Sequence, residues 1–214
     1  FSPVHLQSHL QSAAGAVSVS FDAWELISGA TSKLNRGSNT LVIVSHPLTG
    51  IKTRRGMSAA SLASMRHARC ASLPLHRYLF DAGHNVLVYE SNSLGAHGTA
   101  CADVERACLL AALDHVEAHR AFRYCKVAIL ANGLGASAAL IAMARSPDKF
   151  ATRVRALSAC QPAATDDLAD ALPACTVPVM VSAAPVTKCA ASEMVMGSYV
   201  ERGQSCMYHA VTES

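Results

Sequence analysis

The sequence predicts an α/β fold in which a mostly parallel central sheet is covered by helices on both faces. Short apolar runs bounded by turn residues are typical of the buried strands of a parallel sheet. Between them lie segments with apolar residues at helical spacing, as in folds where strands and helices alternate. A length of 214 residues, with 51% hydrophobic and 15% charged residues, suits one domain with a sizeable core. We therefore expect residues 1–214 to form a single domain, of which residues 1–38 are a less regular N-terminal segment.

Five of the apolar runs are the expected central strands. In chain order they are residues 41–45, 85–89, 126–131, 153–158 and 177–182. Weaker patterns indicate two outer strands at residues 17–21 and 206–211. Helices are expected at residues 73–82, 103–120, 166–172 and 194–200, and directly after Gly135. These elements leave no stretch for a large lid domain.

Charge and hydropathy argue against two classes of protein. A formal net charge of +3 is too small to predict a nucleic-acid-binding protein. No apolar run reaches the roughly 18–20 residues that a transmembrane helix needs, so we expect no transmembrane segment. Residues 1–20 contain no Lys, Arg, Asp or Glu and lack the basic start of a signal peptide. Removal of an earlier targeting segment, and hence import into an organelle, stays open.

The eight cysteines predict a reducing environment. None forms a C-x-x-C pair, which argues against a zinc ribbon or a thioredoxin-type site. They lie in apolar or alanine-rich surroundings, as buried free cysteines do, and a chain of this length does not need a disulfide framework. We therefore expect an intracellular protein of the cytosol or of an organelle matrix.

Residues 126–140 are the stretch around which the rest of the chain is organised. They read as a buried strand, a glycine-rich turn and an alanine-rich helix. Gly133 and Gly135 permit a sharp turn and close backbone packing, and we expect Gly133 to adopt a positive φ. The turn consists of Ala131, Asn132, Gly133, Leu134 and Gly135.

Three motifs, in this order and spacing, resemble the α/β-hydrolase superfamily. The first is the His-Pro loop of residues 46–52, which is similar to the corresponding loop of dienelactone-hydrolase-like members. The second is the segment of residues 81–98, and the third is the strand, turn and helix around residues 131–135. The resemblance spans residues 41–182. It implies a nucleophile elbow of the form G-x-S-x-G, an acid after a late strand and a histidine after the last strand.

The catalytic triad that this resemblance implies is not intact. Gly133 occupies the position of the nucleophile and has no side chain with which to attack a substrate. The loop that follows residues 177–182 contains no carboxylate near the strand, which leaves Asp166, or the neighbouring Asp167, as the acid. His209 is the only candidate for the histidine. A triad requires all three groups within hydrogen-bonding reach of one another.

Other residues near the implied active site have secondary roles. Leu48 is the expected backbone N–H donor of an oxyanion hole, because the proline before it has none. His46 is expected to be a structural histidine of the same loop. Glu90 and His97 are departures from the usual residues of the second motif. Ser137 lies about one helical turn beyond the elbow, which is too far along the helix to replace the nucleophile.

Basic side chains cluster after the His-Pro loop. Residues 52–77 contain no acid and carry Lys52, Arg54, Arg55, Arg66, Arg69 and Arg77. One interpretation is a solvated helix face and loop. The other is a docking patch for an acidic protein or an anionic ligand, which makes these residues the candidate partner surface.

Two histidines lie at helical spacing in the helix expected at residues 103–120. His115 and His119 are four residues apart and therefore share one face of that helix. A metal site usually needs a third ligand, and the zincin motif H-E-x-x-H is not present. We expect a polar helix end with two ordinary histidines and no metal.

The sequence thus predicts a catalytically degenerate hydrolase that serves as an accessory or structural subunit, or as a protein-interaction module, in contact with other protein subunits. Two alternatives stay open. One is a serine-independent or weakly active hydrolase of small esters or thioesters, in which His46, His97 or His209 acts as a general base on water. The other is a receptor that binds a small molecule on the same fold. No cofactor and no nucleic acid are expected.

Overall fold

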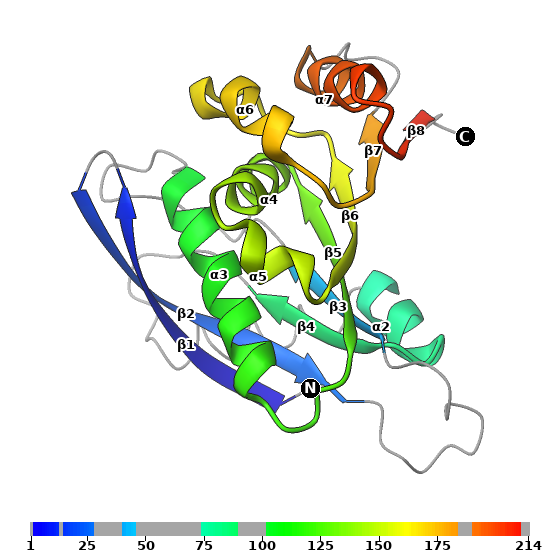
Figure 1. The fold of residues 1–214 in the computed structure, drawn as a ribbon. Helices are drawn as coiled ribbons and strands as arrows, with labels where there is room; N and C mark the ends of the chain where they lie inside the picture. The colour runs from blue at the N-terminus through cyan, green and yellow to red at the C-terminus, as the bar shows by residue number, and fades with distance from the viewer. Residues whose placement is uncertain are drawn as a thin grey trace, which may run out of the picture.

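The computed structural model describes residues 2–12, 15–27, 40–45, 74–89, 102–183 and 190–210. These residues contain one eight-stranded sheet with the order β1-β2-β4-β3-β5-β6-β7-β8 (Figure 1). The strands are β1 (Ser2–Ser12), β2 (Gly15–Leu26), β3 (Thr40–Ser45), β4 (Asn85–Tyr89), β5 (Lys126–Asn132), β6 (Val154–Cys160), β7 (Val179–Ala183) and β8 (Cys206–Ala210). Strands β3 to β8 pair in parallel, whereas β1 pairs with β2, and β2 with β4, in antiparallel fashion. The mostly parallel sheet is confirmed.

Helices cover both faces of this sheet, as expected. They are α2 (Pro74–Asp81), α3 (Ala102–Ala118), α4 (Leu134–Arg145), α5 (Pro147–Ala151), α6 (Asp166–Ala171) and α7 (Ala190–Glu201), with a short 3-10 helix η1 (Leu172–Ala174). Helix α2 packs on one face, against Val42 and Val86, and the other helices share the core on the opposite face. None of the described helices is long and apolar enough to cross a bilayer.

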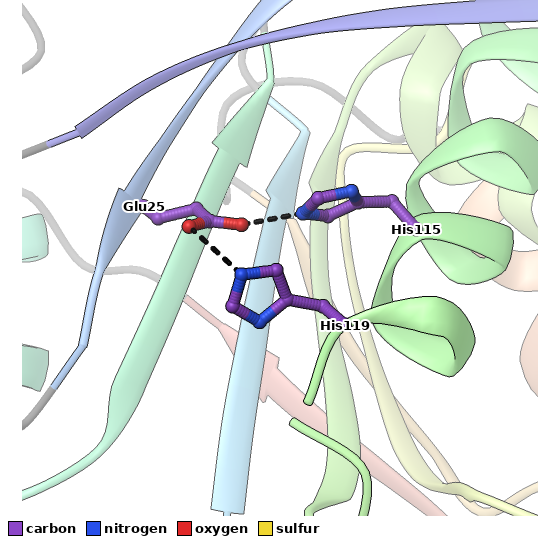
Figure 2. Close-up of side chains that lie close together, drawn as sticks. All are labelled: Glu25, His115 and His119. Atoms are coloured by element: carbon purple, nitrogen blue, oxygen red, sulfur yellow. Dashed lines mark hydrogen bonds and ion pairs between the residues drawn. The ribbon is translucent and has the colours of Figure 1, made fainter. Parts of the chain in front are cut away.

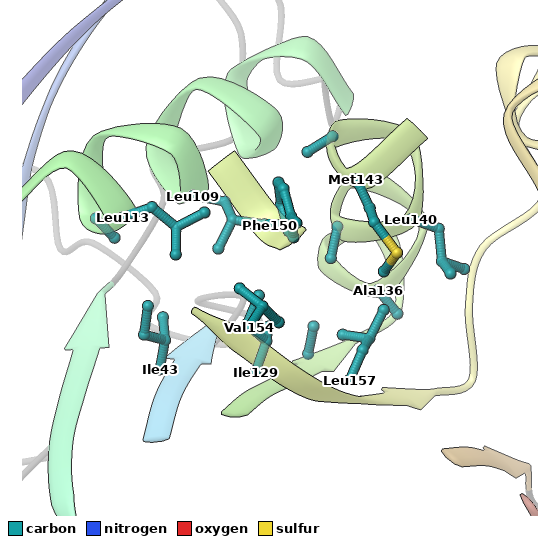
Figure 3. Packing of buried hydrophobic residues seen from close by; sticks show 14 of the residues in the cluster. Ile43, Leu109, Leu113, Ile129, Ala136, Leu140, Met143, Phe150, Val154 and Leu157 are labelled. Atoms are coloured by element: carbon teal, nitrogen blue, oxygen red, sulfur yellow. The ribbon is translucent and has the colours of Figure 1, made fainter. Parts of the chain in front are cut away.

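Alternation along the strands divides the core into these two layers. In β3, Ile43 belongs to the larger core beneath α3 and α4, while Val42 and Val44 belong to the smaller core beneath α2. Figure 3 shows the larger core, in which Ile43 and Ile129 of adjacent strands lie beneath side chains of α3, α4 and α5. A strand buried on both faces reads as a continuous apolar run, which is why the sequence located β3, β4 and β5 well.

The differences from the expected elements include two shifted boundaries and one additional helix. Helix α7 begins at Ala190, four residues before the predicted start at residue 194. Strand β7 begins at Val179, two residues later than predicted. Helix α5 was not predicted; Pro147, at its first position, has a fixed φ that suits a helix start.

The N-terminal segment corrects a further expectation. Instead of being less regular, its described part forms the β1–β2 hairpin, with register pairs from Ser2↔Glu25 to Ser12↔Gly15. Leu6 and Phe21, which are register partners, are buried in the core on the α3 side. The sequence pattern did not predict β1, because only one face of this strand meets the core and the apolar residues on that face are few. Residues 28–39 lie outside the described residues.

A groove of about 610 Å³ lies on the α2 side of the sheet. Its lining includes Leu79 of α2, Ala128 of β5 and Met180 of β7. The described residues that line it include no histidine and no carboxylate. The described lining of this groove therefore contributes no histidine or carboxylate for acid–base catalysis.

Candidate functional site

The elbow is built by the end of β5 and the start of α4. Gly133 is the single residue between them and has φ 56° and ψ −124°, which confirms the expected positive φ. Glycine adopts this left-handed region at little cost because it has no Cβ. The Gly133 N–H donates to the Cys160 carbonyl at 2.9 Å, and the Gly133 carbonyl accepts from the Ala163 N–H at 3.2 Å. The turn is thus tied to β6 and to the loop that follows it.

Gly135 permits a close approach between α4 and β3. A Cβ on Gly135 would lie 2.5 Å from the Ser45 Oγ, which is closer than non-bonded atoms can approach. Ser45 ends β3 and pairs in register with Ala131 of β5. The elbow therefore has both geometric features of a strand–turn–helix nucleophile site, a strained turn residue and a glycine packed against the neighbouring strand.

Gly133, at the position expected for a nucleophile, has no side chain. A Cβ built on Gly133 would meet no atom within 4 Å among the described residues, so the position has room for a side chain but carries none. The Leu134 N–H lies in the first turn of α4, where a helix offers no internal acceptor. Ser137 cannot substitute, because it is buried and its hydroxyl donates to the Ala163 carbonyl at 2.5 Å.

The two expected partners of a nucleophile lie on other elements of the fold. His209 lies within β8, in register with Ser182 of β7. Asp166 begins α6 and is exposed.

Several predicted residues fall outside the part of the chain that the structure describes. They are His46, Leu48, Lys52, Arg54, Arg55, Arg66, Arg69, Glu90 and His97. Of the candidate partner surface only Arg77 is described. Its Nε lies 3.2 Å from an Asp81 carboxylate oxygen one helical turn away, and both side chains are exposed. For Arg77 the arrangement is that of a solvated helix face.

The tyrosine and thiol groups near the elbow have raised pKa values. Burial raises the pKa of the Tyr89 hydroxyl well above its usual value, and the neighbouring Glu105 carboxylate raises it further. Burial likewise raises the pKa of the Cys108 thiol, again with a contribution from Glu105. Burial also raises the pKa of Cys160, whose backbone carbonyl binds the elbow. A thiol needs a lowered pKa to act as a nucleophile, so neither cysteine is activated.

A different cluster lies at the opposite end of α3. The carboxylate of Glu25, on β2, lies between the imidazoles of His115 and His119 (Figure 2). The His115 Nε2 is hydrogen-bonded to Glu25 Oε1, and the His119 Nε2 lies 3.8 Å from Glu25 Oε2. Glu25 is buried with 5% of its side chain exposed, whereas His115 and His119 are 18% and 33% exposed.

The sequence identified the two histidines but not their partner. Glu25 is 90 residues from His115 along the chain, and it was placed in a segment expected to be less regular. Alternation from Phe21 through Ala23 to Glu25 was the available signal, because it places all three side chains on the α3 face of one strand. Helical spacing alone could not supply a third group.

Comparison with known proteins bears on the fold. No protein-family model and no curated protein sequence matches the chain. Among solved structures, dienelactone hydrolase from Anabaena variabilis superposes with a TM-score of 0.62 at 16% identity, over 99% of this chain and 87% of that one. An α/β serine hydrolase without a lid from Xanthomonas campestris gives 0.57 at 18% identity, over 100% and 86%. A carboxylesterase from Lactobacillus plantarum gives 0.57 at 13%, over 99% and 84%. The chain therefore has the α/β-hydrolase fold.

Proposed function

We propose that this protein is a catalytically degenerate α/β-hydrolase-fold protein that serves as an accessory or structural subunit, or as an interaction module, of a larger assembly. The proposal rests above all on Gly133. This residue occupies the turn at which the fold presents a nucleophile, with the strained geometry of that turn and no side chain. Covalent catalysis requires an attacking atom, and glycine offers none.

The surroundings of the elbow support the same conclusion. Ser137, the nearest hydroxyl along α4, is held by the Ala163 carbonyl. Cys160 is kept protonated by burial. His209, the only candidate for the base of a triad, lies within β8 and not in the loop beyond it. An enzyme of the usual kind would need at least a nucleophile and a base within reach of each other.

The test compares the unmodified protein with Gly133→Ser. Both are incubated with p-nitrophenyl esters, short thioesters and a fluorophosphonate probe, and turnover is compared with a heat-inactivated control. We expect no turnover and no labelling of the unmodified protein. Gly133→Ser should fold, because the added Cβ has room. It should cost about 1–3 kcal/mol from backbone strain and gain little or no activity, since base and acid are missing.

Robust turnover by the unmodified protein would overturn the proposal and favour the alternative of a hydrolase with an unusual base. Strong activity in Gly133→Ser alone would also contradict it, because the elbow would then have lost only one group. Folding of each variant is checked by circular dichroism, so that an inactive variant is not confused with an unfolded one.

The basic segment, residues 52–77, is the proposed partner surface. Clustered positive charge speeds docking onto acidic surfaces, and Arg54, Arg55 and Arg66 belong to a stretch without acids. Their combined reversal to Glu should reduce recovery of the protein in its native assembly, measured by native electrophoresis and cross-linking mass spectrometry.

A matched control for this reversal exists on the described surface. Reversal of Arg120, Arg123 and Arg155, which are exposed, changes the net charge equally. The control should leave recovery unchanged. Equal loss in both triple variants, or no loss in either, would remove the basic segment as the docking surface.

A further inference from the structure

We propose that Glu25, His115 and His119 form a binding site for a divalent transition-metal ion of the zinc class. The proposal is independent of the elbow and of the proposed function. It concerns the other end of α3, where the C-terminal end of the helix meets β2 (Figure 2). The outcome expected from the sequence alone was two ordinary histidines, and the structure adds the third group that this expectation lacked.

The donor set suits the ion. Two imidazole nitrogens and one carboxylate oxygen form a common protein ligand set of zinc sites that keep one position open for water. One ligand atom from each of the three side chains lies within 4.8 Å of the others. Tetrahedral zinc, with bonds of about 2.0–2.1 Å, separates neighbouring ligand atoms by roughly 3.3 Å. The three groups can reach that spacing through small rotations of side chains that already face one another.

The backbone positions these ligands in advance. His115 lies in the last turn of α3, and His119 is the first residue after this helix; the His119 N–H donates to the His115 carbonyl at 2.8 Å, which keeps the two residues one turn apart. Glu25 is fixed from both sides of its strand, because it pairs in register with Ser2 of β1 and with Leu87 of β4. Little conformational entropy is therefore left to lose when an ion binds.

A buried aromatic ring supports the two imidazoles. Phe122 is fully buried, and its ring centroid lies 4.8 Å from that of His119 and 6.4 Å from that of His115. The contact restricts the orientation of both rings, as an outer layer of residues does around metal ligands. His119, one-third exposed, gives an ion a path from solvent.

A hydrogen bond from the backbone sets the tautomer of His119 when no ion is bound. The His119 Nδ1 accepts a hydrogen bond from the Ala121 N–H at 3.2 Å, so the proton of the neutral ring is on Nε2 and faces Glu25. When an ion binds Nε2, the single proton of the neutral ring moves to Nδ1. The hydrogen bond from the Ala121 N–H is then given up, and this N–H lies in an exposed turn where water can accept from it.

The test uses the full chain after treatment with a chelator. Zn²⁺ is titrated by calorimetry, Co²⁺ by its visible absorption, and the melting temperature is followed at increasing Zn²⁺. We expect one ion per chain, a tetrahedral Co²⁺ spectrum, and a melting temperature that rises with free metal. His119→Gln, at a partly exposed position, and Glu25→Gln should each weaken Zn²⁺ binding at least tenfold.

His9→Gln is the matched control. His9 is exposed on β1 and lies seven register positions from the partner of Glu25, roughly 24 Å along the ladder. It should bind Zn²⁺ like the unmodified protein. Absence of stoichiometric binding, or equal affinity in His119→Gln and the unmodified protein, would overturn the proposal. If Glu25→Gln fails to fold, His119→Gln still decides the question.

Discussion

The two ends of helix α3 present opposite arrangements of backbone and chemistry. At its N-terminal end, Glu105 lies behind the elbow, and its carboxylate is 3.9 Å from where a Cβ of Gly135 would be. There the backbone has an unusual geometry, but the ionisable groups are buried. About 15 Å along the helix, His115 in its last turn and His119 just beyond its end face Glu25, and both are partly exposed.

This difference separates two requirements that active sites usually combine. A strained turn positions a reactive atom, and exposed ionisable groups provide one. The elbow has the turn, but Gly133 supplies no reactive side-chain atom. The cluster of Glu25, His115 and His119 has ionisable groups, but its backbone is not strained. Backbone geometry and reactive groups are therefore separable properties of one fold.

Removal of the ring beneath the histidines should have the largest effect. Phe122→Ala removes a fully buried aromatic side chain from the main core and should lower the free energy of unfolding by about 3–5 kcal/mol. Urea denaturation measures this cost. A change below about 1 kcal/mol would mean that the core does not support His115 and His119 as their ring contacts with Phe122 indicate.

Alkaline pH should destabilise the elbow side of the core. Burial raises the pKa of Cys175 from 9.0 to about 11, and its thiol donates to the Leu140 carbonyl of α4 at 3.3 Å. The unfolded thiol ionises near pH 9 and the folded thiol only near pH 11. The folded state therefore holds the proton more tightly, and its stability falls as pH rises between these values, by on the order of 2–3 kcal/mol.

Urea denaturation at several pH values between 8 and 11 checks this slope. The matched variant is Cys175→Ala, which removes the titrating group and should show a shallower decline. Identical slopes in the two proteins would show that Cys175 does not ionise on unfolding in this range, and hence that the thiol is less shielded than the structure indicates.

The smallest of the three effects concerns the close approach at the elbow. Gly135→Ala should cost about 1–3 kcal/mol, because its Cβ would meet the Ser45 Oγ at 2.5 Å. In a Ser45→Ala background the nearest remaining atom is the Cβ of residue 45, at 3.4 Å. The cost of Gly135→Ala should then fall by at least half. Equal cost in both backgrounds would place the constraint elsewhere.

The sequence predicted the parts of the fold in which local pattern and burial agree. Strand β4 was located to the residue, and Gly133 was assigned its positive φ, because each depends on neighbours in the chain. The hairpin was missed since β1 is polar, and the cluster was missed because Glu25 meets His115 only through tertiary structure. The strand expected at residues 206–211 was found as β8, with His209 inside it.

The hairpin that begins the chain has a consequence for how the molecule opens. Eleven residue pairs join β1 to β2, but only four join β2 to β4. In native-state hydrogen exchange, the amides at the β2–β4 seam should therefore exchange before those inside the hairpin, which would detach as one cooperative unit. Glu25 lies at this seam and contacts His115 and His119, so the two histidines tie the hairpin to the end of α3.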